Sequence, residues 1–302
     1  MLTILIKASS FVLVVCLGYF FKKRGLISLQ EGHALSKIVM TVTLPCALLL
    51  SAKSITLSGF LLIPLGLALL ANGLMLALGY IRGRKAEPLS KTQNVIQLSG
   101  FNIGNFAFPF VQSFFPVSYL MYVILFDTGN AIMVFGGNYA VASLFSSGSE
   151  KLTVGAFLKK LLHSVPFVTY LICFVLSILQ WHLPGPILTI AKVGADANPF
   201  LAMFVLGVMV DLKFNRQALQ ELGQLLGLRL FGSGLMVALV TLLPLDMVVK
   251  QMLTICLLAP IAVVTPLYAQ ELGIKSSVPA TVNSLTILSS IVLITIFLLS
   301  FA

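Results

Sequence analysis

Charged residues are scarce in this sequence of 302 residues. Asp, Glu, Lys and Arg make up 9% of the chain, whereas a soluble globular domain carries about 25%. Hydrophobic residues make up 59%, which is more than a water-soluble fold of this length can bury, so the expected solvent is a lipid bilayer. The apolar runs are continuous and roughly twenty residues long. This pattern excludes the alternation of membrane β-strands and predicts transmembrane α-helices.

Motifs of enzymes and of ATP-driven pumps are also missing. The sequence has no P-loop and no Gly-x-Gly-Asp pattern of intramembrane aspartyl proteases. The triplet Asp127-Thr128-Gly129 occurs once, and aspartic proteases need two facing aspartates. We therefore expect a protein that is not an enzyme and holds no cofactor. The cysteines lie singly in apolar runs, which predicts small buried residues and no metal site; they are Cys16, Cys46, Cys173 and Cys256.

Basic residues outnumber acidic ones by 19 to 9. They form short clusters between apolar runs, as in the cytoplasmic loops of membrane proteins, so no nucleic-acid partner is expected. The cluster at 22–24 follows the first apolar run, which predicts a first span with its N-terminus outside and no cleavable signal. With that loop in the cytoplasm, most basic residues, Arg229 among them, fall at the inner side. The exceptions are Lys7, Lys53, Lys192 and Lys250.

This bias predicts an even number of spans, with both termini on the non-cytoplasmic side of a bacterial inner membrane. A loop at 146–160 divides the chain into residues 1–148 and 149–302 with five spans each, so the halves must have opposite orientations. The predicted fold is an all-α membrane protein with ten transmembrane helices in a 5+5 inverted repeat. The predicted spans are 2–21, 33–51, 56–80, 93–114, 118–145, 161–182, 186–210, 222–244, 248–270 and 276–301.

Weak internal similarity between the halves agrees with this repeat. Equivalent spans carry Leu44-Pro45 and Asn198-Pro199, then Phe108-Pro109-Phe110 and Thr265-Pro266-Leu267, and finally Thr128-Gly129-Asn130 and Thr281-Val282-Asn283. By this symmetry Asn130 and Asn283 are candidates for a binding site. The alternative is that they form hydrogen bonds between helices.

Two predicted spans contain residues that interrupt helices. The fourth has Asn102, Asn105 and Pro109 with two glycines, and the ninth has Pro260 and Pro266 around Thr265. Because proline removes a backbone donor, we expect broken helices that cross near the middle of the membrane. The second half of each would bring a helix N-terminus with unpaired N–H groups to the crossing, which favours an anion such as a carboxylate. The alternative is a pair of ordinary proline kinks.

Two acidic residues fall inside predicted spans, where ionisable groups are functional candidates. Asp127 is the first candidate for carrying a coupling proton, and a hydrogen-bonded structural carboxyl is its alternative. Asp196 is the second candidate, and an ion pair with Lys192, four residues away, is the alternative there.

Around the broken helices the sequence resembles the auxin efflux carrier family, which includes bacterial permeases for malonate and related dicarboxylates. Asn102 lies seven positions before Pro109, and Pro260 is followed by the string at 269–273, Ala-Gln-Glu-Leu-Gly. The resemblance implies that Asn102 contacts substrate and that Pro260 marks the second crossing helix. It also implies a scaffold made by the first two helices of each repeat, or by the first, second and fifth. The long central loop of the plant carriers is missing and the second proline of the ninth span is shifted, so auxin is not the expected substrate.

The ten-span layout is also similar to that of the bile acid:sodium symporters, although their sodium ligands are not recognisable here. We therefore expect a secondary active transporter of small organic anions, with Asn102, Asn105, Asn130, Asn283 and Thr265 at the site. Coupling to H⁺ or Na⁺ and a homodimeric state are left open. The alternatives are a sodium-coupled symporter like the bile-acid group and a membrane receptor or sensor that does not transport.

Overall fold

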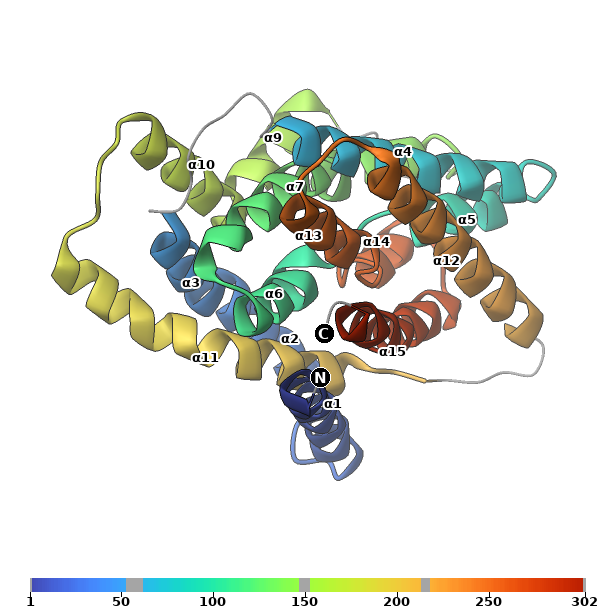
Figure 1. The fold of residues 1–302 in the computed structure, drawn as a ribbon. Coiled ribbons are helices and arrows are strands. Elements are labelled where there is room, and N and C mark those ends of the chain that lie inside the picture. The colour runs from blue at the N-terminus through green and yellow to red at the C-terminus, as the bar shows by residue number, and fades with distance from the viewer. Residues whose placement is uncertain (1, 53–61, 147–152, 213–217, 301–302) are drawn as a thin grey trace.

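The structure is a computed structural model that describes residues 2–52, 62–146, 153–212 and 218–300. Every regular element in these ranges is a helix (Figure 1). Seven helical segments of these ranges are long and apolar enough to cross a membrane, and an eighth span results if the bent pair α9 and α10 is counted as one. The predicted multi-pass helical membrane protein is thus confirmed, whereas ten spans are not established by this count.

The first half of the chain contains continuous, kinked and interrupted helices. Two π-helical segments, η1 and η6, lie within longer helical runs, and a third, η4, begins the run that continues into α6. Its elements are α1 (Leu2–Lys23), α2 (Leu29–Ile38), η1 (Val39–Thr43), α3 (Leu44–Ser51), α4 (Leu62–Gly83), α5 (Pro88–Leu98), η4 (Ile103–Ala107), α6 (Phe108–Phe114), η5 (Val117–Tyr119), α7 (Leu120–Ile132), η6 (Met133–Gly137) and α8 (Asn138–Ser143).

The second half begins with an amphipathic helix and ends with a long apolar one. Its elements are α9 (Val154–Leu162), α10 (Val165–Ile178), α11 (Gly185–Met209), α12 (Leu219–Leu242), α13 (Met247–Leu257), α14 (Thr265–Glu271) and α15 (Val278–Leu299). The predicted boundary at 148/149 lies outside the described residues, as do Lys53, Lys151, Lys213 and Arg216, which belong to the predicted charge bias.

The sixth predicted span, 161–182, contains α10 and has a sharp bend near its start. Helices α9 and α10 meet at an angle of 75°. The bend falls at Ser164, ahead of Pro166 in the first turn of α10, where the missing proline N–H removes no hydrogen bond. The Thr153 hydroxyl caps α9 by accepting a hydrogen bond from the Ala156 N–H. The chain therefore starts two separate helices within one apolar segment.

Helices α1, α3 and α11 form one packed group, and α1 crosses α11 at one edge of the molecule (Figure 1). Two glycines allow the α1 and α11 backbones to touch. A Cβ atom on Gly18 would lie 2.1 Å from the Phe204 carbonyl oxygen, and one on Gly207 would lie 2.0 Å from the Val15 carbonyl oxygen. Small residues are the usual means of close helix packing in membranes.

Replacing Gly207 with alanine is expected to lower the thermal unfolding midpoint, because the two backbones must separate to admit one methyl group. Overpacking of this kind costs about 1–3 kcal/mol. The matched control is Gly73→Ala on α4, where an added Cβ has no neighbour within 4 Å. Equal midpoints for the two variants, measured by differential scanning fluorimetry in one detergent, would contradict the close α1–α11 contact.

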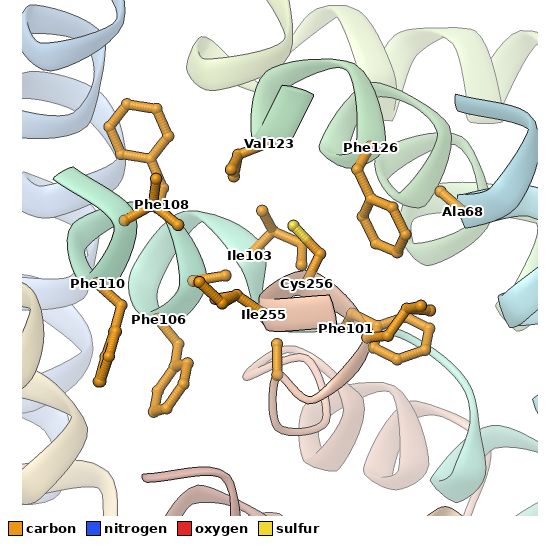
Figure 2. Packing of buried hydrophobic residues seen from close by; sticks show 14 of the residues in the cluster. Ala68, Phe101, Ile103, Phe106, Phe108, Phe110, Val123, Phe126, Ile255 and Cys256 are labelled. Carbon is orange, nitrogen blue, oxygen red and sulfur yellow. The ribbon is translucent and has the colours of Figure 1, made fainter. Parts of the chain in front are cut away.

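The main apolar core lies around the interrupted helices (Figure 2). Phe106 and Phe110 stack with ring centroids 5.9 Å apart, and Phe101 meets Phe126 edge-on at 5.9 Å. Cys256 of α13 lies within this core. All four cysteines are free, but the prediction that they are buried is wrong for Cys16, which is exposed on the apolar helix α1.

Candidate functional site

The predicted break in the fourth span is present, but it does not lie at Pro109. Helix α5 ends at Leu98, and helical structure resumes at Ile103. Between them Gly100 has φ +83°, a left-handed conformation that favours glycine. Pro109 is the second residue of α6, six positions after helical structure resumes at Ile103. The break is therefore made by residues 99–102, several positions before the proline.

The predicted break in the ninth span lies between α13, which ends at Leu257, and α14, which begins at Thr265. Pro260 is inside the break, while Pro266 lies in the first turn of α14. The two breaks are in direct contact, because the Asn102 N–H donates a hydrogen bond of 2.8 Å to the Pro260 carbonyl oxygen. The nonhelical parts of two segments far apart in the sequence thus meet at one point.

Asn130 of α7 holds the break of the fourth span through its side-chain amide. Its Oδ1 accepts from the Phe101 N–H at 3.0 Å, and its Nδ2 donates to the Phe101 carbonyl at 2.8 Å. The amide thereby replaces both hydrogen bonds that Phe101 would make within a helix, which the apolar surroundings require. Nδ2 also donates to Asp127 Oδ1 at 2.9 Å.

Asn283 of α15 acts on the other break in a similar way. Its Nδ2 donates to the carbonyl oxygens of Ile261 at 3.0 Å and of Ala262 at 3.2 Å. The Ile261 N–H donates to the Thr286 hydroxyl at 3.2 Å. Each break thus has an asparagine that satisfies its unwound backbone. The hydrogen-bonding role that was the alternative for Asn130 and Asn283 is therefore present.

A third asparagine, Asn72 of α4, was missed by the sequence analysis. Its Oδ1 accepts from the Gly100 N–H at 2.9 Å and from Asn138 Nδ2 at 3.1 Å, and its Nδ2 donates to Asn130 Oδ1 at 3.3 Å. The residue is fully buried. A single asparagine in the middle of the apolar run 62–83 was the available signal, since such residues usually have a partner.

Arg229 of α12 is a second missed residue. It was predicted only as part of the charge bias at the inner side, and in the structure its side chain is buried within the protein, with 2% exposed. The guanidinium donates to the Leu98 carbonyl at 2.6 Å and to the Ala259 carbonyl at 3.2 Å. Arg229 therefore contacts the ends of both half-helices that lead into the breaks.

A cavity of about 70 Å³ lies beside the contact between the breaks. The Nδ2 atom of Asn102 and the Oδ1 atom of Asn105 have no hydrogen-bond partner among the described residues, although both are buried. Asn105 Nδ2 donates to the Ser36 hydroxyl at 3.3 Å. The cavity is lined by Met40, Phe101, Asn102, Ile103, Gly104, Asn105, Asp127, Asn130, Ala131, Val134, Phe135, Ser164, Pro166, Phe167, Tyr170, Ala262, Val263 and Val264.

Asp127 contributes the acidic group of this cavity. Its Oδ2 accepts a hydrogen bond of 2.6 Å from the hydroxyl of Tyr170 on α10, which the sequence analysis did not single out. Asp196, the other candidate, does not line the cavity. It forms an ion pair of 2.8 Å with Lys192, and both side chains are about two-thirds exposed (64% and 65%).

The remaining candidates lie elsewhere around the crossing. Pro266 and Asn283 line a second cavity of about 380 Å³, together with His33, Asp211 and Lys275. Val263 lines both cavities, so the two adjoin at the ninth-span break. Pro109, Pro260 and Thr265 line neither. The predicted site is thus divided, with Asn102, Asn105, Asp127 and Asn130 on one cavity.

The chain has a distant relative among known transporters. Comparison with models of known protein families finds no match. Over 235 residues the chain is 26% identical to an uncharacterized transporter of Methanothermobacter thermautotrophicus, an alignment that covers 76% of this chain and 75% of that protein. Together with the apolar helices, this likeness supports an integral membrane transporter and suggests a protein other than an enzyme. Membership of the auxin efflux carrier family stays a prediction.

Proposed function

We propose that the protein is a secondary active transporter of small organic anions such as mono- or dicarboxylates. The observation that carries the proposal is the cavity beside the two breaks, into which a buried asparagine brings an unpaired amide donor. Asn102 Nδ2 is buried without a partner among the described residues. A buried donor without a partner is costly, and a bound carboxylate oxygen would supply the missing acceptor.

The backbone around the cavity also favours a negatively charged ligand. Residues 103–105 begin the helical run that continues into α6, and residues 262–264 immediately precede α14. Helix N-termini carry partial positive charge and unpaired N–H groups, which favour anions. A cavity of about 70 Å³ suits a ligand of few atoms, which favours a short carboxylate such as malonate over a bile acid.

The proposed architecture has ten spans in two inverted halves of five. The seven apolar spans and the bent α9–α10 pair account for eight. The broken pairs α5–α6 and α13–α14 would be the fourth and ninth. The equivalent roles of Asn130 and Asn283 support the repeat, because each holds the break of its own half. The proposed location is a bacterial inner membrane with both termini outside.

Alternating access would move the two breaks together against a scaffold that contains α1, α3 and α11. Helices α1 and α3 each pack closely on α11. The hydrogen bond between Asn102 and Pro260 joins the breaks into one unit. Movement of that unit, by an elevator or rocking motion, would carry the cavity from one side of the membrane to the other.

Uptake into proteoliposomes tests the proposal. The purified protein is reconstituted, and a panel of radiolabelled mono- and dicarboxylates is offered with and without Na⁺ and with proton gradients of either sign. Saturable uptake of at least one carboxylate, competed by its unlabelled form, is expected. Carboxylate binding without counterflow would indicate a receptor instead, and a panel with neither binding nor uptake would refute the organic-anion proposal.

Replacing Asp127 with asparagine is expected to abolish the dependence of uptake on the proton gradient. Asp127 is the acid that lines the cavity. The variant retains the shape of the carboxyl group and one accepting oxygen but replaces the other oxygen with an NH2 group and removes the titratable proton. Initial uptake rates are measured with and without an inward proton gradient. Asp196→Asn, which removes an exposed carboxylate from α11, is the control and should keep the wild-type dependence. If Asp196→Asn alone lost the dependence on the proton gradient, Asp196 and not Asp127 would be the residue that carries the proton.

A further inference from the structure

Arg229 occupies an unusual position for an arginine in a membrane protein. It lies ten residues into the 24-residue apolar helix α12, and its side chain is buried against protein. A charged group at such depth is costly, and retaining it requires polar partners. Among the described residues the one ion pair is Lys192–Asp196, so no described carboxylate pairs with Arg229.

The partners of Arg229 are backbone carbonyls at two helix ends. Leu98 is the last residue of α5, and Ala259 lies two residues beyond the end of α13. The guanidinium donates to the carbonyl oxygens of both. The last carbonyls of a helix lack intrahelical partners and carry partial negative charge, which a buried cation offsets. One side chain thereby fixes the ends of both incoming half-helices relative to each other.

The same guanidinium also lies next to the candidate site. Its Cζ is 4.1 Å from the centroid of the Phe101 ring, within cation–π distance. Phe101 lines the cavity, and its backbone is held by Asn130. The positive charge is therefore one side chain away from the ligand space.

Among the described residues that line the cavity, Asp127 is the one with an acidic or basic side chain. Without another charge nearby, an anionic ligand would meet that carboxylate alone. The nearby cation offsets this repulsion, and its field is weakly screened because the site is buried.

We infer that Arg229 has two roles at the crossing. It joins the two breaks as a positioning residue, and its positive charge makes the cavity selective for anions. Only the second half of this inference, the selectivity of the cavity for anions, rests on the proposed function. The first half, the joining of the breaks, concerns the protein without ligand.

The first half is tested by hydrogen–deuterium exchange of the full chain in nanodiscs without ligand. Arg229→Met removes both hydrogen bonds but keeps an apolar side chain of similar length, and Arg229→Lys retains a charged donor. Exchange at Gly100, Phe101, Asn102 and Ile261, whose amides are hydrogen-bonded within the breaks, should become about tenfold faster in Arg229→Met. The exchange rates in Arg229→Lys should lie between those of the wild type and those of Arg229→Met. Unchanged exchange in both breaks would overturn the positioning role.

The second half is tested with two ligands of nearly equal shape, malonate and its singly charged half-amide, malonamate. Dissociation constants are measured for wild type, Arg229→Lys and Arg229→Gln by thermal shift. Removal of one positive charge should weaken dianion binding about tenfold more than monoanion binding in Arg229→Gln. Arg229→Lys should keep the wild-type ratio. The control Arg24→Gln removes an exposed arginine charge and should also keep it.

The outcomes separate the inference from the proposed function. An equal loss for both ligands in Arg229→Gln would leave Arg229 with a packing role and overturn its charge role. If the wild-type protein binds a cation instead, the organic-anion proposal fails, and the charge role then predicts tighter cation binding in Arg229→Gln. Faster exchange in Arg229→Met supports the joining of the breaks whichever ligand binds.

Discussion

Replacing Asn102 with alanine is expected to lower carboxylate uptake by about tenfold to a hundredfold, the effect of losing one hydrogen bond to a charged ligand. The side-chain Nδ2 has no partner among the described residues, so its removal breaks no hydrogen bond that this atom makes in the protein. The bond that joins the two breaks comes from the Asn102 backbone N–H, which alanine retains. The thermal unfolding midpoint should therefore stay close to that of the wild type.

The matched control for this variant is Asn198→Ala. Asn198 is buried in α11, where Nδ2 donates to Gln112 and Oδ1 accepts from Thr43, and it does not line the cavity. Its removal should lower the unfolding midpoint and leave the apparent KM for uptake unchanged. Initial rates over a range of substrate concentrations, corrected for reconstituted protein, separate the two variants. Uptake by Asn102→Ala at the wild-type rate would remove Asn102 from the binding site.

Replacing Asn130 with leucine is expected to cause the largest loss of stability among single side-chain changes at the crossing. Leucine has similar volume but leaves the Phe101 N–H without a partner. It also takes one donor from the Phe101 carbonyl, which keeps the Ile103 N–H, and one donor from Asp127. Each buried polar group left unpaired costs about 1–3 kcal/mol. The sum is on the order of 3 kcal/mol or more, a large share of a typical folding free energy.

Thermal unfolding and hydrogen exchange at the fourth-span break measure this effect. Asn283→Leu is the matched variant in the other half, since Asn283 donates to the carbonyls of Ile261 and Ala262 while the Ile261 N–H has Thr286 as its acceptor. It should destabilise the protein less than Asn130→Leu. Wild-type stability in Asn130→Leu would mean that the unwound backbone has other partners than the structure shows.

The positions of the breaks follow from sequence only in part. Clusters of glycine, asparagine and proline in apolar runs predict that a helix is interrupted, because each of these residues weakens the helical backbone or competes for its hydrogen bonds. They do not predict where the interruption lies. Proline can lie at the start of a helix as well as at its end. Pro266 is in the first turn of α14, and Pro109 lies six positions after helical structure resumes at Ile103. The break in the fourth span instead contains Gly100, whose φ is positive.

The partners of the breaks were harder to predict. Asn130 and Asn283 could be identified by comparing the two halves of the sequence, whereas Asn72 and Arg229 were not identified in this way. Arg229 was assigned to the inner interface because charge alternation concerns loops and helix ends and contains no information on depth. Tyr170 gave no signal, since aromatic residues are frequent in apolar helices and its hydrogen bond to Asp127 depends on the packing of α10 against α7.

The measurement that tests the central claim most directly is a thermal-shift screen of carboxylates against wild type and Asn102→Ala, with and without Na⁺ and at several pH values. A ligand that binds the native state raises the unfolding midpoint in a concentration-dependent way. The account predicts that at least one short carboxylate stabilises the wild type and that Asn102→Ala loses most of this shift while unfolding at a similar temperature without ligand. A carboxylate shift of equal size in both proteins would contradict binding at the crossing of the broken helices.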